Sequence, residues 1–395
     1  GLSILLSLLL VGGIFTVFVQ DSPDDNDSNT DTELDELCKG IQSYPHTVSL
    51  ANDFVISAVD GSGEFPVIQQ DGIYVHFITA SSATYKTASA RQHKLSSIHG
   101  VSPIYKQFVI LSDDNQVLRS GYENLLNDFL GLELKEIVQE SDYCEVFSKH
   151  GKKIKQDAVT WNKLTMSKAS EIASHAYLLK TMAELGMAIK TLAQSPRYLL
   201  IDSSLVYFML GQTPFLPEIL KRYLITKANQ QGTGVIALCK SHNIPNGDLI
   251  ARFAKNNLGL KDHWYLRLPS KALGEKTPNF LKGKEIPPKL SVSYLFKFEA
   301  TQFPMRIDVD AQWWLEHIAY DKQKEQQLFA DLDFTCHEVR SYGYPYPMHA
   351  AHRSASLTKQ ERRALKDILI QSAMKEGVVR SGSMLDPEQL HMSGM

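Results

Sequence analysis

Two largely apolar runs of the chain each end on an aspartate that is followed by small residues. The first run spans residues 54–59 and precedes Asp60, and the second spans residues 198–201 and precedes Asp202. Apolar runs of this length are typical of strands that are buried inside a sheet. Because α/β folds place metal-binding and catalytic groups where such strands leave the core, the pattern predicts two carboxylates at functional positions.

The rest of the pattern predicts strands first, and then strands that alternate with helices. Strands are expected at residues 53–62, 65–80, 106–112, 198–201, 232–239, 291–298 and 304–309. Helices are expected within 118–147 and at 167–194, 216–229, 248–257, 313–332 and 359–376. This order indicates an α/β protein with a mixed sheet on which helices pack.

The N-terminal region departs from this pattern. Residues 2–19 are uncharged and mostly apolar, a length that suffices for one membrane span. No Lys or Arg precedes Lys39, so neither a signal peptide nor a membrane orientation can be inferred. Two interpretations of residues 1–20 stay open, a membrane anchor and a dispensable extension. Residues 21–50 are predicted to be an acidic disordered linker, residues 51–380 the folded domain and residues 381–395 a flexible tail.

Composition limits the partners and the compartment. A net charge of −3 and a pI near 6.5 give no overall signal for nucleic acid, so any DNA contact must use a local basic patch. Two runs offer such a patch or, alternatively, an ordinary solvated face: Lys149, Lys152, Lys153 and Lys155, and Lys271, Lys276, Lys282, Lys284 and Lys289. Four widely spaced cysteines without a CxxC unit predict reduced thiols in a cytoplasmic protein: Cys38, Cys144, Cys239 and Cys336.

Carboxylates dominate the candidate chemistry. Taken singly, Asp60 suits a turn with Gly61, and Asp202 suits a helix cap. Taken together, after two buried strands, they favour a divalent cation, which prefers hard oxygen ligands on a rigid frame. Glu184, on the helix before the second strand, is the expected third carboxylate, and Glu171 on the same helix is the alternative.

Two further features could act on a phosphate. Lys240 ends a buried strand, where it either steadies negative charge or extends from the sheet edge into solvent. A second group gathers polar aromatic side chains within eleven residues: Tyr342, Tyr344, Tyr346, His349 and His352. Prolines 345 and 347 predict an extended backbone here. His352 is a candidate metal ligand or proton-transfer group and Tyr344 a candidate phosphate ligand, against the alternative of a proline-rich loop with core tyrosines.

These elements, in this order, resemble the NurA family of DNA-end-processing nucleases. The family's early Asp-Gly-Ser is matched at residues 60–62, and its helical glutamate before a second Asp-Gly-Ser-like strand end is matched by Glu184 and Asp202. The second motif here is Asp-Ser-Ser. A strand that ends on lysine follows at residues 235–240, and the closing Gly-Tyr-Pro and Ala-His-Arg signature is matched at residues 343–345 and 351–353.

The resemblance implies a ribonuclease H-like fold and a manganese- or magnesium-dependent nuclease. It implies 5′ to 3′ exonuclease and endonuclease activity on single- and double-stranded DNA ends, as in double-strand break repair. It also implies a homodimer that docks on HerA, a hexameric DNA-translocating ATPase. The residues carried over by the resemblance are Asp60, Glu184, Asp202, Tyr344 and His352, with Asp60, Asp202, Glu184 and His352 as metal ligands.

Two other hypotheses belong to different classes. A non-catalytic adaptor subunit of a DNA-translocating ATPase would bind its partner without degrading DNA. A phosphotransferase of the actin and sugar-kinase type would have similar aspartate strands, but the chain lacks a later glycine-rich segment for adenosine.

Overall fold

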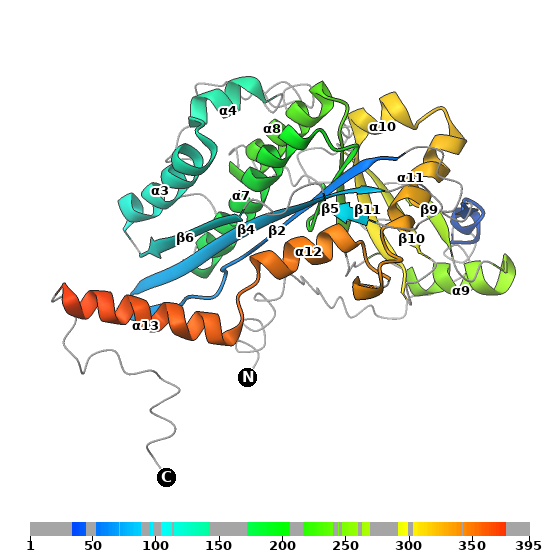
Figure 1. Cartoon of the computed structure of the whole chain (residues 1–395). Coiled ribbons are helices and arrows are strands. Elements are labelled where there is room, and N and C mark those ends of the chain that lie inside the picture. The colour runs from blue at the N-terminus through cyan, green and yellow to red at the C-terminus, as the bar shows by residue number, and fades with distance from the viewer. Residues whose placement is uncertain are drawn as a thin grey trace, which may run out of the picture.

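The structure is a computed structural model, and it describes most of the chain between residues 34 and 376. The described residues are 34–44, 53–70, 72–87, 95–97, 104–112, 114–141, 172–205, 216–239, 244, 247–259, 263–268, 291–298, 303–341 and 343–376. Within them, eleven strands form one sheet, with α-helices on both faces (Figure 1).

Five neighbouring strands form the centre of the sheet in the order β6-β4-β2-β7-β8. The pairs β6–β4 and β4–β2 are antiparallel, whereas β2–β7 and β7–β8 are parallel. An antiparallel meander that continues into two parallel strands is the ribonuclease H-like arrangement, so the expected fold is confirmed. The bounds are β2 (Val55–Ser62), β4 (Ile73–Thr87), β6 (Ile104–Leu111), β7 (Tyr198–Ile201) and β8 (Gly234–Cys239).

An antiparallel extension continues the sheet beyond β8, in the order β11-β10-β9-β1. Two short strands complete the other edge, where both pair with β4. The bounds are β1 (Gln42–Ser43), β3 (Ile68–Gln70), β5 (Leu95–Ser97), β9 (Trp264–Leu268), β10 (Ser291–Lys297) and β11 (Met305–Asp310).

Side chains of the central strands alternate between two cores. Val59, Leu199 and Ile201 enter the core under α7 (Ile172–Thr191), whereas Ala58 and Leu200 enter the opposite one. Three more helical elements cover the first face with α7, namely α3 (Asn115–Asn124), α4 (Leu134–Glu140) and α8 (Leu216–Gln230), and a π-helical turn, η3 (Leu125–Leu130), joins α3 to α4. The opposite face carries α10 (Ala311–His317), α11 (Lys322–Phe334) and α12 (Tyr346–Ala355), so the central strands are buried on both sides (Figure 1).

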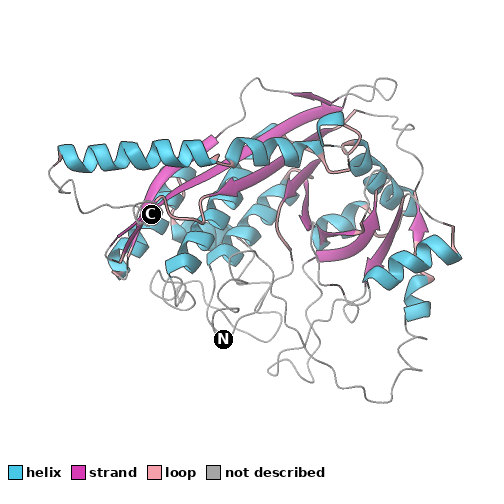
Figure 2. Ribbon diagram, turned by 90° about the horizontal axis from the view of Figure 1, so that it is seen from below, coloured by secondary structure: helices cyan, strands magenta, loops and turns pink. Residues whose placement is uncertain are grey.

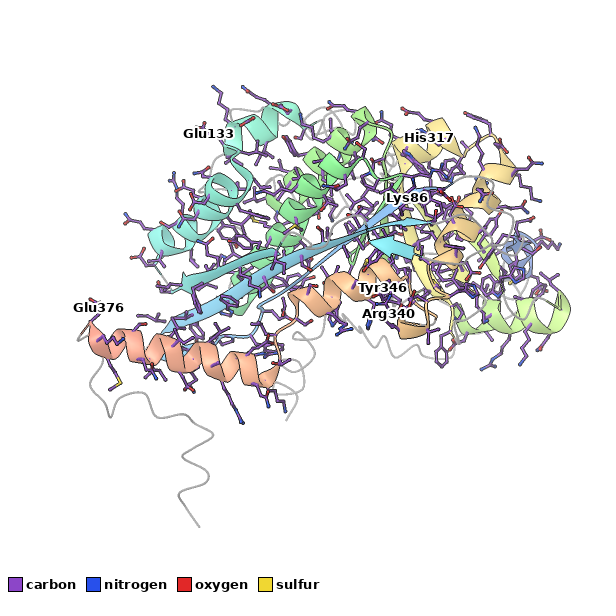
Figure 3. All side chains as sticks on the ribbon, viewed as in Figure 1. Lys86, Glu133, His317, Arg340, Tyr346 and Glu376 are labelled. Atoms are coloured by element: carbon purple, nitrogen blue, oxygen red, sulfur yellow. The ribbon has the colours of Figure 1, made fainter. Side chains whose placement is uncertain are left out.

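Hydroxyl groups of β4 tie α12 to the sheet. Ser81 Oγ donates to the carbonyl of Ala351 at 2.7 Å, and the Thr79 hydroxyl donates to the carbonyl of Ala355. Tyr346, at the first turn of α12, lies beside Arg340 (Figure 3), whose guanidinium is 4.2 Å from the centre of its ring. These contacts fix both ends of the helix that carries His352.

Three expected elements differ from the structure. The single strand expected over residues 65–80 is two antiparallel strands, β3 and β4, and β4 continues to Thr87. The prolines at 345 and 347 were expected to keep the chain extended, but they occupy the cap and first turn of α12, where a missing N–H costs nothing. The single helix expected over 313–332 is two helices, because Asp310 caps α10 and Asp321 starts α11 by accepting from the amides of Gln323 and Lys324.

Other elements were not expected from the pattern. Strand β9 was missed, whereas the helix expected at 248–257 is present as α9 (Gly247–Asn257). Part of the expected linker is folded, because β1 pairs with β9 while Cys38, Ile41 and Tyr44 are buried. The expected final helix is α13 (Lys359–Lys375), which begins at a capping box formed by Thr358 and Glu361, and it extends along the edge of the molecule (Figure 2).

The apolar residues 2–19 lie outside the described residues. No helix within the described part of the chain is long and apolar enough to cross a membrane. Cys38, Cys239 and Cys336 are free thiols there.

Candidate active site

The parallel pairing of β2 and β7 places the two aspartates next to each other. Val59 is registered with Ile201, and the next residue of each segment is Asp60 and Asp202. Adjacent strands lie about 4.8 Å apart, so the two carboxylates leave the sheet at one edge. Asp60 is 5% exposed, whereas Asp202 is exposed in the bend after β7. The pair identified from the sequence is therefore brought together.

Glu184 joins this pair from α7. The Gly61 amide donates to Asp60 Oδ1 at 2.8 Å and also to Glu184 Oε1 at 3.1 Å, so one N–H links the two carboxylates. The Glu184 pKa is raised to about 7, chiefly by burial; the charges of Asp60 and Asp202 contribute to the rise, and Lys180 opposes it. These effects place all three carboxylates within electrostatic reach of one another.

Glu184 can lie this close to the backbone of Gly61 because Gly61 has no side chain. A Cβ at this position would lie 2.7 Å from Glu184 Cγ and 2.9 Å from the carbonyl oxygen of Thr79. Both separations are shorter than a Cβ contact can be, so any other residue would displace Glu184 or the strand. The glycine of the Asp-Gly-Ser motif is needed for space beside the carboxylates.

Lys180 is a site residue that the sequence analysis missed. Its ammonium lies 3.3 Å from Glu184 Oε1, one helical turn away on α7. Burial alone would lower the Lys180 pKa, but nearby carboxylates offset it and raise this pKa above its ordinary value: Glu184, Glu64 and Asp60. Glu64 was also missed, although it follows Asp60 by only four residues. A helical i, i+4 lysine–glutamate pair is common on surfaces, and only the fold shows that this one is largely shielded from solvent.

His352 contacts Asp60 from the opposite side of the sheet. Its Nδ1 lies 2.6 Å from Asp60 Oδ2, and its Nε2 lies 3.2 Å from the hydroxyl of Ser356. The imidazole is 55% exposed, whereas the Asp60 side chain is 6% exposed. Both oxygens of Asp60 are therefore held, Oδ1 by the Gly61 amide and Oδ2 by the imidazole, and this fixes the plane of the carboxylate.

Tyr344 reaches the same region from the turn before α12. Burial raises its pKa well above the ordinary value, and the charges of Asp202 and Asp60 contribute next. The Gly343 amide donates to the carbonyl of Cys336 at 2.9 Å, and Gly343 adopts φ +88°, a conformation that favours glycine. The Gly-Tyr-Pro motif therefore makes a turn that brings Tyr344 towards the aspartates.

The donor set suits a hard divalent cation. Asp60, Asp202 and Glu184 offer only carboxylate oxygens, which Mg²⁺ and Mn²⁺ prefer. Within the described residues, no group of three or more His, Cys, Asp or Glu side chains is arranged, as it stands, so that it could hold a metal ion. Asp60, Asp202 and Glu184 lie near one another, and Lys180 supplies a positive charge among them.

Several predicted site residues fall outside the described residues. These are Lys240, which follows the last residue of β8, the alternative carboxylate Glu171, Tyr342 and both lysine runs. Tyr346 and His349 lie on α12, and the Tyr346 ring packs edge-on against Tyr85 of β4, which gives it a structural role.

The chain matches no protein-family model, and no curated protein sequence matches it. Among solved structures it is similar to the NurA nuclease from Sulfolobus solfataricus, with 11% identity, a TM-score of 0.47 and coverage of 95% of this chain and 98% of that chain. A NurA structure with manganese has 13% identity, a TM-score of 0.36 and coverage of 97% and 98%. A Ciona intestinalis endonuclease V in complex with DNA has 11% identity, a TM-score of 0.32 and coverage of 88% and 100%. The fold assignment rests on the strand order and pairing described above.

Replacing Gly61 by alanine should weaken the carboxylate cluster. The new Cβ would push Glu184 away, so we expect the affinity for Mn²⁺, measured by calorimetry on metal-free protein, to fall at least tenfold. Overpacking of this kind should also lower the free energy of unfolding by about 1–3 kcal/mol.

Gly234→Ala is the matched control, because its Cβ would lie 2.8 Å from the Trp313 ring at the far end of β8. We expect a similar loss of stability and no loss of Mn²⁺ affinity. Equal Mn²⁺ affinities in the two variants would contradict the importance of the space at Gly61.

Proposed function

We propose that this protein is a divalent-metal-dependent nuclease that hydrolyses phosphodiester bonds of DNA. The observation that carries the proposal is the convergence of Asp60, Asp202 and Glu184, from two parallel strands and the helix packed across them, at one edge of the sheet. Burial, and after it the charges of Asp60 and Asp202, raise the pKa of Glu184, and a doubly charged cation would offset the repulsion among the three carboxylates.

Asp60, Asp202 and Glu184 would hold Mn²⁺ or Mg²⁺. When bound, the cation would supply Lewis-acid chemistry, which lowers the pKa of a water molecule and stabilises the leaving 3′-oxygen. The Gly61 amide keeps Asp60 and Glu184 in fixed relative positions, so the ligand oxygens need little reorganisation when the cation arrives.

The remaining residues would act on protons and on the phosphate. His352 is hydrogen-bonded through Nδ1 to Asp60. We therefore assign it two roles, orientation of the Asp60 carboxylate and proton transfer, in preference to metal ligation. Tyr344 would position the phosphate through its hydroxyl, which its raised pKa keeps protonated. Lys240, as in the sequence analysis, would neutralise charge on the phosphate.

The resemblance of the closing motif to that of the NurA family supports a proposal for the substrate and the partners. We propose that the protein acts on single- and double-stranded DNA ends with 5′ to 3′ polarity, as a homodimer with a HerA-type hexameric ATPase, in double-strand break repair. Light scattering coupled to gel filtration, with and without such an ATPase, measures both assemblies. A monomer that elutes apart from the ATPase would contradict this part of the proposal.

Asp60→Asn tests the catalytic proposal directly. The amide preserves the shape of the side chain but removes its charge, so we expect Mn²⁺-dependent degradation of end-labelled linear DNA to fall at least 10³-fold. The control is Asp53→Asn, which changes an exposed aspartate just before the same strand and should cleave at the wild-type rate.

Each result of this assay has a definite meaning. Cleavage by Asp60→Asn at the wild-type rate would refute the mechanism. A wild-type protein that binds a DNA-translocating ATPase but degrades no DNA with Mn²⁺ would instead support the adaptor hypothesis.

His352→Ala separates proton transfer from metal ligation. If the imidazole moves a proton, we expect the rate at saturating Mn²⁺ to fall by about 10²-fold or more, a loss that added Mn²⁺ does not restore, although loss of the contact with Asp60 also weakens Mn²⁺ binding. A full recovery of the rate at high Mn²⁺ would show that His352 is a metal ligand.

A further inference from the structure

Asp308 is a buried carboxylate of β11 that lies behind the Asp202 loop. It is 0% exposed. It accepts hydrogen bonds from residues of β10 and β11 and from the loop after β7. From the sheet, Ser293 Oγ donates to Oδ1 at 2.7 Å, and Arg306 donates from Nε to Oδ1 at 2.8 Å and from Nη2 to Oδ2 at 3.2 Å.

The loop supplies the other two bonds. Ser204 Oγ donates to Asp308 Oδ2 at 2.8 Å, and the backbone N–H of Leu205 donates to the same oxygen at 3.1 Å. These donors come two and three residues after Asp202. A buried carboxylate is stable only when its lone pairs are satisfied, so displacing the loop would leave Oδ2 with the guanidinium as its one remaining donor among the described residues.

Two neighbouring elements hold the same loop by its backbone. Lys221 Nζ on α8 donates to the carbonyl of Ser204 at 3.1 Å, and the Cys239 thiol of β8 donates to the carbonyl of Ser203 at 2.9 Å. The loop therefore leaves β7 in a direction that three separate elements fix, namely β8, α8 and β11, and the buried carboxylate of Asp308 is the contribution of β11.

We propose that Asp308 is a positioning residue that holds Asp202 in place for the cation. By anchoring Ser204 and Leu205, it sets the direction of the bend that begins at Asp202 and so the separation between Asp202 and Asp60. The inference rests on the proposed function, because it concerns the same metal-binding carboxylates. It adds a charged group that contacts neither the cation nor the substrate.

Strand β7 provides a matched comparison at its other end, where the strand begins. Asp331 is also 0% exposed, and it accepts from Tyr198 Oη at 2.7 Å, where β7 begins, and from Gln327 Nε2 at 2.7 Å. Asp331 also forms an ion pair with Arg197, as Asp308 does with Arg306. Asp331 thus anchors the end of β7 that is remote from Asp202.

The test compares Asp308→Asn with Asp331→Asn by titrating Mn²⁺ into metal-free protein in a calorimeter. Both variants lose a buried charge beside an arginine, so both should melt at lower temperature than the wild type. Only Asp308→Asn should also lose Mn²⁺ affinity, by about tenfold or more, as second-shell substitutions do. Asp331→Asn should stay within about twofold of the wild type, because no metal ligand depends on it.

A second, less disruptive pair of variants tests the inference if Asp308→Asn does not fold. Ser204→Ala removes one bond to Asp308 from the loop side, whereas Ser203→Ala changes the neighbouring serine, whose hydroxyl makes no bond to Asp308 among the described residues. We expect a Mn²⁺ affinity about threefold or more below the wild type for Ser204→Ala, and no change for Ser203→Ala.

The outcomes distinguish the inference from the proposed function. If the wild type binds Mn²⁺ in an Asp60-dependent way and Asp308→Asn binds it as well as Asp331→Asn, Asp308 is only a stabilising core residue and the inference is overturned alone. Unchanged affinity in Ser204→Ala overturns it in the same way. If the wild type binds no Mn²⁺, the proposed function fails and the inference fails with it.

Discussion

The parallel pairing of β2 with β7 is the constraint on which the candidate site depends. It joins segments that are more than a hundred residues apart and sets Val59 beside Ile201, so Asp60 and Asp202 follow at the same edge. The alternation of side chains then sends Asp60 towards α12 and Gly61 towards α7. A shift of the pairing by one residue would exchange these faces and separate the carboxylate from His352 and the glycine from Glu184.

This arrangement concentrates negative charge that the protein must offset. Two like charges about 4 Å apart repel by roughly 4 kcal/mol near a protein surface, so three carboxylates cannot be held together by packing alone. The fold supplies partners for three of these carboxylate oxygens. Lys180 pairs with Glu184, and the Gly61 amide and His352 each take one oxygen of Asp60. Asp202 stays exposed, which leaves the cluster open on the side where a cation would enter.

The sequence predicted the strands of the site better than it predicted their surroundings. Buried strands such as β2, β7 and β8 have apolar runs that are visible locally, and helical periodicity was enough to find α7. The helix α12 was missed because prolines at 345 and 347 exclude a helix interior, whereas the structure uses them where a helix begins. Lys180 and Asp308 were missed for a different reason. Their partners are set by packing between segments, and neither residue differs locally from an ordinary surface lysine or a strand-end aspartate.

The two Asp-small-Ser motifs look equivalent in sequence, but the structure treats them differently. At the first, Glu184 lies directly over Gly61, so a side chain there has no room. At the second, the residue after Asp202 is Ser203. Among the non-glycine residues of the described chain, Ser195 alone has a positive φ, so the backbone at Ser203 does not call for glycine. The serine that both motifs share is Ser204 in the second motif, and its hydroxyl donates to Asp308. The replacement of glycine by serine in the second motif is therefore compatible with the site, and the residue that links this motif to Asp308 is the next one, Ser204.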